Sequence, residues 1–497
     1  MKMISYLKER ARPAFVIFLL AFLIRALHLL ASKQILSYEM RLNDGMFFDA
    51  LATALVQGTH NSAQPVVGLS PVYVGFLFFF QKLFGHELLW PRLAQIILGS
   101  LACVGLQQIT RNLFGNRAGW IAGFLSAFCG IFIYFDMILI KSSLVNFSLI
   151  FFIWFFQQSL SSPVRVAAAG AFYMTAAMLR MQIIITLPWI IWVWIRTAWQ
   201  KRSLRHGLCL ILFFAVMFGV QFAFGAWFKS AMIHTQGVPK AEEVAGPQSG
   251  IHFYLGNHSN ANGTYKRVSG IRPSAVGHVV DARNIAEREL RHSLTASEVN
   301  AFWTKSAFSA IREIPVRWVI LEAKKFFLIW NAYEIPNSQN YEYWRRLSWV
   351  LCLPLVSYGW LAPLALVGWI RLRKDERMMV RFLKGFAASY ILSLLLFFVT
   401  ADYRLPLHPI WIIFAAFTLD AVWSDIEHQR LETLRKSILL FMLFFLFCNM
   451  ETYLNRYNYE ISMRQRVEAV LHPSKKISGN TPVTAIKAGS NDQVSAG

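Results

Sequence analysis

Long apolar runs recur along this chain, and they constrain its fold more than any other feature of the sequence. The clearest runs are Pro13–Leu30, Gly207–Phe228, Leu347–Ile370, Phe382–Val399 and Ser437–Phe447. A helix of about 20 apolar residues crosses the hydrocarbon core of a bilayer. With 56% hydrophobic and only 15% charged residues, the composition is not that of a soluble protein. The sequence therefore predicts an all-α polytopic membrane protein with about eleven spans.

The expected spans are counted from an N-terminus placed in the cytoplasm, which sets the side of the membrane for each loop. Their approximate positions are 13–32, 91–110, 118–138, 143–160, 165–180, 183–198, 207–228, 347–370, 382–400, 406–424 and 436–454. This order leaves two long loops, 33–90 and 229–346, on the non-cytoplasmic side together with the C-terminal tail. Within these loops, the stretches Val72–Phe84 and Trp318–Trp330 are expected to lie along the membrane surface.

The chain is expected to consist of one transmembrane domain over residues 1–455 and a tail over residues 456–497. From about residue 472 the tail is rich in Ser, Gly, Asn, Thr and Lys and poor in aromatic residues. Such a composition cannot bury enough apolar surface to fold. We therefore expect the end of the tail to be disordered.

The formal net charge of +22 is concentrated in basic clusters. These clusters are Lys2 to Arg12, Arg111 with Arg117, Arg196 to Arg205, Arg371 to Lys384, and Arg430 to Lys436. Each falls in a short connection after every second span, which is how the positive-inside rule marks a cytoplasmic face. The charge is therefore assigned to topology, and nucleic-acid binding is not expected.

The sequence shows no sign of a cofactor site. Its cysteines all lie in apolar runs, without the spacing of a disulfide framework or a metal site; they are Cys103, Cys129, Cys209, Cys352 and Cys448. A phosphate-cradling Gly-rich loop of the Walker type is also missing. We therefore expect neither a metal nor another cofactor.

Charged residues within or beside membrane spans are functional candidates by default. The first candidates are Asp44 and Asp49, just beyond the first span. Because the two are five residues apart, they do not share one face of a helix well, and we expect them to play separate roles. The alternative is that Asn43 or Asp44 serves only as a helix N-cap.

A second candidate is Arg404, squeezed between the ninth and tenth expected spans. At this depth an arginine needs an anion, and its planar fork suits a phosphate or a carboxylate. Two alternatives are a local ion pair with Asp402 and extension of the side chain to the lipid headgroups.

The third candidates are Asp136 and Lys141, which lie five residues apart between the third and fourth expected spans. They could pair with one another or contact lipid headgroups. In a functional role, Lys141 would bring positive charge to a phosphate. Arg25 with His28 in the first span, and Arg180 at the end of the fifth, are weaker candidates on the same ground.

The order of short motifs resembles the GT-C superfamily of membrane glycosyltransferases, which includes the protein O-mannosyltransferases and the bacterial lipid A aminoarabinose transferases. The matching pieces, in chain order, are Asp44, Ala52–Gly58, Ser70–Tyr73, Leu113–Gly119, Tyr254–Asn257, Glu334–Asn337 and Tyr403–Pro406. The resemblance covers nearly the whole chain. One departure is that the first-loop acid in that superfamily is often followed directly by a second acid, whereas Gly45 follows Asp44 here.

The resemblance implies a GT-C-like bundle that transfers a sugar from a polyprenyl-phosphate carrier to an acceptor hydroxyl on the non-cytoplasmic face, with inversion. Asp44, or else Asp49, would act as the base. Arg404 would stabilise the departing lipid phosphate with Lys141 as a helper. Further substrate-binding candidates are Tyr403, Asp136 and Glu334.

The implied partners are the lipid-linked sugar donor, an acceptor that is a protein, a lipid or a glycan, and membrane lipid. The implied location is the bacterial inner membrane.

The main rival is a transporter or flippase of lipid-linked sugars, which also needs basic residues near the midplane of the membrane. Transporters often show repeated halves with broken helices in matching positions, and the sequence shows no such repeat.

Overall fold

The computed structural model describes residues 2–33, 44–59, 70–159, 162–201, 204–235, 248–272, 277–337 and 340–454. Parts of the expected loops 33–90 and 229–346 lie outside these ranges, as does the tail with the disorder expected from residue 472. Contacts between residues divide the chain into one unit over Met1–Tyr453 and another over Leu454–Gly497. The following description concerns the first unit.

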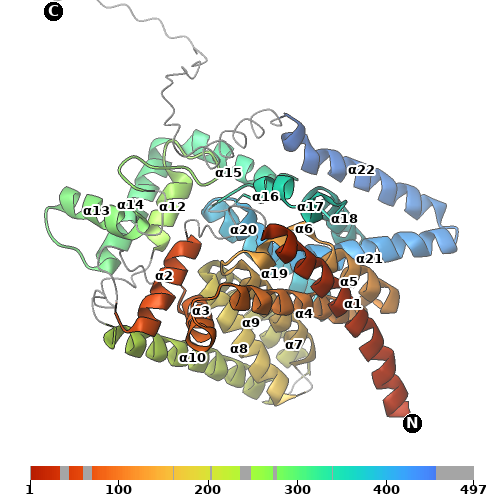
Figure 1. The fold of residues 1–497 in the computed structure, drawn as a ribbon. Helices are drawn as coiled ribbons and strands as arrows, with labels where there is room; N and C mark the ends of the chain where they lie inside the picture. Colours follow the sequence, from red (N-terminus) through yellow and green to blue (C-terminus); the bar gives the residue numbers. More distant parts are fainter. Residues whose placement is uncertain are drawn as a thin grey trace, which may run out of the picture. The chain divides into compact units, whose positions relative to one another are not determined.

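Helices make up almost all of the described chain (Figure 1). The first half contains α1 (Lys2–Ser32), α2 (Asp44–Gln57), α3 (Pro71–Phe84), α4 (Leu89–Phe114), α5 (Asn116–Ala127), α6 (Gly130–Met137), α7 (Ser142–Gln158), α8 (Pro163–Leu179), η3 (Met181–Thr186), α9 (Leu187–Lys201) and α10 (Leu204–Ile233). The second half contains α12 (Ser249–Asn257), η4 (Gly277–Asp281), α13 (Ala282–Leu290), α14 (Ala296–Glu313), α15 (Pro315–Trp330), α16 (Tyr341–Leu347), α17 (Trp349–Cys352), α18 (Tyr358–Arg371), α19 (Met378–Leu396), α20 (Ala401–Arg404), η5 (Leu405–Leu407), α21 (His408–Glu427) and α22 (Leu431–Leu454).

Seven helical segments of the described chain are long and apolar enough to cross a membrane. They are Arg12–Ser32, Leu89–Phe114, Met181–Gln200, Gly207–Ile233, Met378–Leu396, Ala401–Glu427 and Leu431–Leu454. The pair α6 and α7, bent by 120°, adds an eighth if it counts as one span, and α3 and α8 are apolar but shorter. The all-α polytopic fold is confirmed, although the expected eleven spans exceed the seven or eight segments that have the required length.

The shortfall arises partly because two expected spans, 118–138 and 347–370, are broken. The first divides into α5 and α6, and the second into α17 and α18. At the breaks, the backbone N–H of Val356 donates to the carbonyl of Phe128 (2.9 Å), and the N–H of Gly130 donates to the carbonyl of Val356 (3.1 Å). Each break thus satisfies backbone groups of the other, which the apolar interior requires. Pro354 also disfavours helix at the residue before it.

A buried ion pair ties α1 to α6. Nε of Arg25 lies 2.7 Å from a carboxylate oxygen of Asp136, and both side chains are almost fully buried. The hydroxyl of Ser143 donates to the other carboxylate oxygen at 2.6 Å. The carboxylate of Asp136 packs directly against α4 at Gly99, where an added Cβ would lie only 2.0 Å from Oδ2. Two charges at this depth are tolerated because each is matched by the other and by further hydrogen bonds.

The helices α12, α13 and α14 gather around a small apolar core of their own (Figure 1). Its buried members are Ile251, Leu255, Ile271, Ala282, Trp303 and Phe398. Phe398 belongs to the extended segment between α19 and α20, in which the N–H of Val399 donates to the carbonyl of Gly263, and the N–H of Ala401, the first residue of α20, donates to the carbonyl of Ile335. This segment is therefore held by the long loop before it enters α20.

The topology gives a first prediction. Four of the five cysteines are buried, and only Cys352 is exposed, so a Cys352→Ser variant provides a background with little thiol reactivity. Exposed Asn260 and exposed Lys374 are then replaced by cysteine one at a time. We expect a membrane-impermeant maleimide to label residue 260 from the non-cytoplasmic side and residue 374 only from the cytoplasmic side. Labelling of residue 260 from the cytoplasmic side alone would refute this topology.

Candidate functional site

Asp44 is the first residue of α2, in the helical turn where the helix dipole favours a negative charge. Burial raises the pKa of its carboxyl. Among its neighbours, Lys141 and Arg180 oppose that increase, whereas the carboxylate of Asp402 adds to it. Asp44 therefore lies in a group of two cations and a second carboxylate that come from four separate parts of the chain.

The start of α2 packs closely against the segment that precedes α7. A Cβ added at Gly45 would lie 2.9 Å from the backbone carbonyl oxygen of Leu139. Only a glycine fits at this contact without a shift of one of the two segments. The absence of a second acid directly after Asp44 thus has a steric reason, and the same contact brings α2 beside the segment that carries Lys141.

Lys141 directly precedes α7 and is half-buried. Among the residues that the structure describes, its ammonium group has neither a hydrogen bond nor an ion pair. The N-terminal N–H groups of α7 add partial positive charge at the same place. A half-buried cation in this position favours an anionic ligand.

Arg180 follows α8 and is only 3% exposed. Its Nη2 atom lies 3.6 Å from a carboxylate oxygen of Asp402, and its guanidinium plane lies over the ring of Tyr403, 4.6 Å from the ring centre. Within the described chain, Nε and Nη1 have no hydrogen-bond partner. Because buried guanidinium N–H groups are costly without partners, this fork is available for a bidentate anion.

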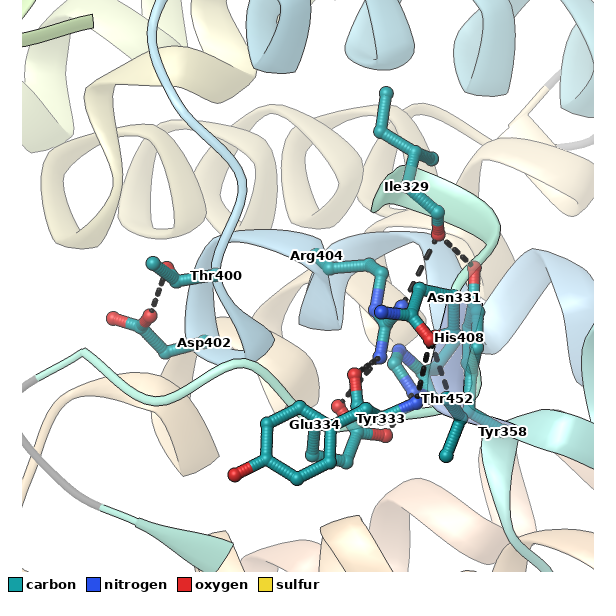
Figure 2. Close-up of polar contacts among 10 residues, drawn as sticks. All are labelled: Ile329, Asn331, Tyr333, Glu334, Tyr358, Thr400, Asp402, Arg404, His408 and Thr452. Atoms are coloured by element: carbon teal, nitrogen blue, oxygen red, sulfur yellow. Dashed lines mark hydrogen bonds and ion pairs between the residues drawn. The ribbon is translucent and has the colours of Figure 1, made fainter. Parts of the chain in front are cut away.

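Asp402 is the second carboxylate of the group. The hydroxyl of Thr400 donates to one of its oxygens at 2.6 Å, and the side-chain amide of Asn337 donates to the other at 3.3 Å. Figure 2 shows that the side chain lies apart from Arg404, its neighbour two residues later in the sequence. Asp402 therefore pairs with Arg180 and orients that guanidinium, and it does not form the local pair with Arg404 that the sequence allowed.

Arg404 is buried in contacts with the protein itself (Figure 2). Its Nη2 donates to a carboxylate oxygen of Glu334 at 2.7 Å. The carbonyls of Ile329 and Asn331 accept from Nη1, and the guanidinium carbon lies 3.7 Å from the ring centre of Tyr358. With its Nη donors engaged in this way, Arg404 keeps only Nε without a partner in the described chain, so it offers a lipid phosphate one N–H and not the fork expected from the sequence.

Glu334 is the anion that Arg404 needs. Burial alone raises the pKa of its carboxyl, but Arg404 and His408 outweigh burial and hold the pKa below its ordinary value. Both side chains are almost fully buried, so the pair stabilises the fold at the end of α15. A direct contact of Glu334 with substrate is not what this geometry favours.

Two other candidate acids also have structural partners. Asp136 pairs with Arg25 and not with Lys141. Asp49 is 1% exposed and accepts from the amide of Gln81 at 2.9 Å, with Nε2 of His86 at 3.0 Å from its other oxygen. Asp49 thus holds α2 against α3, which leaves Asp44 as the acid of the first loop that lies beside the two cations.

The sequence named most members of this group but did not bring them together. Asp44, Lys141 and Tyr403 were candidates, and Arg180 was flagged by the cost of a charge between spans. Asp402 was considered only as a partner of Arg404.

Metal ligation has no support from geometry in the described ranges, where no group of three or more His, Cys, Asp or Glu side chains could hold an ion.

No family model and no curated protein matches this chain. Its fold is similar to that of solved membrane proteins, among them the archaeal oligosaccharyltransferase AglB from Archaeoglobus fulgidus in complex with an inhibitory peptide and a dolichol-phosphate. That similarity has a TM-score of 0.46 at 13% identity and covers 89% of this chain and 55% of AglB. The apo form of the Archaeoglobus fulgidus oligosaccharyltransferase gives a TM-score of 0.45 at 13% identity, with the same 89% and 55% coverage.

A third similar structure is that of ArnT from Cupriavidus metallidurans bound to undecaprenyl phosphate. It has a TM-score of 0.36 at 13% identity, with 85% of this chain and 79% of ArnT covered. The present chain spans about half the length of AglB.

The contacts of Arg404 give a second prediction. Arg404→Leu leaves the Glu334 carboxylate buried without its cation, so we expect a loss of about 3–5 kcal/mol in stability. The double variant Arg404→Leu/Glu334→Leu should recover much of this loss, because neither charge then remains buried alone. Thermal unfolding of purified protein in detergent measures both. If Arg404→Leu unfolds like the parent and loses only donor binding, Arg404 belongs to the phosphate site after all.

Proposed function

We propose that this chain is a GT-C-type membrane glycosyltransferase that moves a sugar from a polyprenyl-phosphate carrier to an acceptor hydroxyl at the non-cytoplasmic face of the membrane. The observation that carries the proposal is the group formed by Asp44, Lys141 and Arg180. It combines a half-buried carboxylate with two cations, one of which has two guanidinium nitrogens without partners in the described chain. A proton acceptor and an anion site are the two requirements of this chemistry.

The anion site is suited to a lipid phosphate. The fork of Arg180 binds two phosphate oxygens in parallel, and Lys141 adds a point charge. Asp402 and the ring of Tyr403 hold the guanidinium in place. The phosphate role assigned to Arg404 from the sequence therefore moves to Arg180, and Lys141 keeps its part.

The proton acceptor is Asp44. The carboxylate takes the proton of the acceptor hydroxyl while the oxygen forms its bond to the anomeric carbon of the sugar. The bond from that carbon to the phosphate oxygen breaks, and the lipid phosphate leaves with its electron pair. A single displacement of this kind inverts the anomeric centre. Burial raises the pKa of Asp44 towards neutral pH. A general base is most effective when its pKa lies near the pH at which the enzyme works.

The exposed face of α10 agrees with a location in the membrane. Helix α10 exposes Leu208 (66%), Ile211 (66%) and Phe222 (78%), an apolar face that a bilayer covers. We place the enzyme in a bacterial inner membrane, with its N-terminus in the cytoplasm and its tail outside. Residues 1–455 would form the transmembrane domain. The acceptor is a protein, a lipid or a glycan with a free hydroxyl, and the proposal includes no cofactor.

The role of Asp44 gives a third prediction. Asp44→Asn keeps the shape of the side chain but cannot accept a proton, so we expect sugar transfer to fall by about 10²–10⁴-fold. Transfer from a radiolabelled polyprenyl-phosphate sugar in membranes measures this loss. If Asp44 were only a helix cap, Asn would serve nearly as well.

Asp49→Asn is the matched control for Asp44→Asn. Asp49 lies one and a half turns further along α2 and contacts Gln81 and His86, so we expect lower stability with most of the activity per folded molecule retained. A dead Asp49→Asn variant beside an active Asp44→Asn variant would move the base to Asp49. Full activity in both variants would end the enzymatic role of this loop.

The anion site gives a fourth prediction. Arg180→Gln and Lys141→Met each remove a charge that faces the phosphate, and we expect each to weaken binding of undecaprenyl phosphate by about tenfold or more, since charge-assisted hydrogen bonds contribute about 1.5–3 kcal/mol. Arg165→Gln, at the exposed start of the same helix α8, is the control and should bind like the parent. Unchanged binding in both site variants would contradict the proposed function.

A further inference from the structure

A row of aromatic and imidazole rings leads from the long loop to the anion site. We call it the ring wall; its members are His252 on α12, Tyr265, His278 in η4, Phe398 and Tyr403. The ring centres of His252 and His278 are 5.1 Å apart, and that of His252 is 6.3 Å from Phe398. Phe398 lies 5.2 Å from Tyr403, over which the Arg180 guanidinium lies. The ring wall therefore ends at the proposed phosphate site.

His252 has a fixed orientation within the ring wall. Its Nδ1 lies 2.9 Å from the backbone carbonyl oxygen of Gln248, one turn earlier on α12. A carbonyl only accepts hydrogen bonds, so Nδ1 carries the proton and donates it, which leaves a lone pair on Nε2. The ring is half-buried, and no described residue forms a hydrogen bond with Nε2.

The other imidazole has a partner. The hydroxyl of Tyr265 lies 2.9 Å from Nε2 of His278, and the ring centres of these two residues are 5.6 Å apart. Since a phenol readily donates to a neutral imidazole, His278 is satisfied within the ring wall. Of the two imidazoles in the ring wall, His252 is therefore the one whose acceptor nitrogen, Nε2, has no partner in the described chain.

The charge on His252 decides what it can bind. Burial lowers its pKa to about 4; the hydrogen bond to Gln248 opposes the decrease, and the ammonium of Lys141 adds to it. The imidazole is then neutral at physiological pH and brings no positive charge to a phosphate. Its lone pair instead accepts a hydrogen bond from a hydroxyl group.

We propose that His252 is a sugar-recognition residue, whose Nε2 accepts a hydrogen bond from a hydroxyl of the sugar on the lipid phosphate while the rings of the wall contact the sugar face. This inference rests on the proposed function, because it needs the phosphate at Arg180 and Lys141. The sugar is bonded directly to that phosphate, so its hydroxyl groups lie close to the phosphate site. Lys141 acts electrostatically on both Asp44 and His252, so both side chains lie within electrostatic reach of the same cation.

Two substitutions at His252 separate the two ring nitrogens. Asn reproduces the position of Nδ1 and can still donate to Gln248, but it has no atom at the position of Nε2. Gln reaches the position of Nε2 with an oxygen that accepts hydrogen bonds. The pair therefore tests the open acceptor atom with similar changes in side-chain volume.

The experiment measures binding of three probes to the full chain in nanodiscs: undecaprenyl phosphate, and the same carrier with glucose or with mannose on the phosphate. We expect the parent to bind at least one sugar-bearing carrier more tightly than the bare carrier. His252→Asn should weaken binding of that sugar-bearing carrier by about fivefold to tenfold, the loss expected for one neutral hydrogen bond. Its affinity for undecaprenyl phosphate should not change, and His252→Gln should stay close to the parent.

Three results overturn the inference. Equal weakening of bare and sugar-bearing carriers shows a structural or phosphate role for His252. Unchanged binding of all carriers by His252→Asn, with or without a lower turnover, shows that no sugar contact is made. A parent that binds every carrier alike has no sugar recognition at this site.

Failure of the proposed function gives a different result from failure of this inference. If the parent binds none of the three carriers, or if Arg180→Gln and Lys141→Met bind undecaprenyl phosphate like the parent, the phosphate site itself is wrong. The His252 inference then falls with it. If those two variants lose the bare carrier and only the His252 results fail, the proposed function stands and the sugar contact does not.

Discussion

The buried pair of Arg404 and Glu334 is the contact on which the geometry of the candidate site depends. It joins the end of α15 to α20, two segments that are about 70 residues apart in sequence. A charge taken out of water is tolerated only with excellent partners, and these partners hold α20 in one position. Asp402 and Tyr403 come directly before Arg404 in the sequence. The pair thereby fixes the two groups that orient Arg180.

The charged residues of the interior form two classes with different consequences. In the first class, each charge lies within a few ångströms of an opposite charge: Arg25 pairs with Asp136, and Arg404 pairs with Glu334. These pairs form further hydrogen bonds with a serine hydroxyl and with backbone carbonyls. Asp44, Lys141 and Arg180 instead influence one another at longer range, and part of their hydrogen-bonding capacity is open in the described chain. Matched charges stabilise the bundle, and incompletely matched ones can bind an anion and move a proton.

The sequence predicted the features that depend on local pattern. Apolar length and basic clusters indicated the membrane fold, and the cost of a buried charge pointed to Asp44, Lys141 and Arg180. It did not predict the paired breaks at 128–130 and 353–356, because each needs backbone groups from a distant segment. It assigned a phosphate to Arg404 for the same reason, since the Glu334 partner is brought there only by the fold. The sequence left open whether Asp44 or Asp49 is the base, because what packs against each carboxylate depends on the fold.

The close contact between Gly45 and the Leu139 carbonyl limits how this site could be re-engineered. A carboxylate introduced at position 45 would need a shift of α2 or of the segment that carries Lys141, because the added Cβ would already lie 2.9 Å from that oxygen. An adjacent pair of acids at the start of α2 is therefore incompatible with the present spacing between α2 and the segment that carries Lys141. A designer who wanted to convert this protein into a divalent-cation enzyme would have to bring the second carboxylate from another helix, and Asp402 already lies in the same electrostatic neighbourhood.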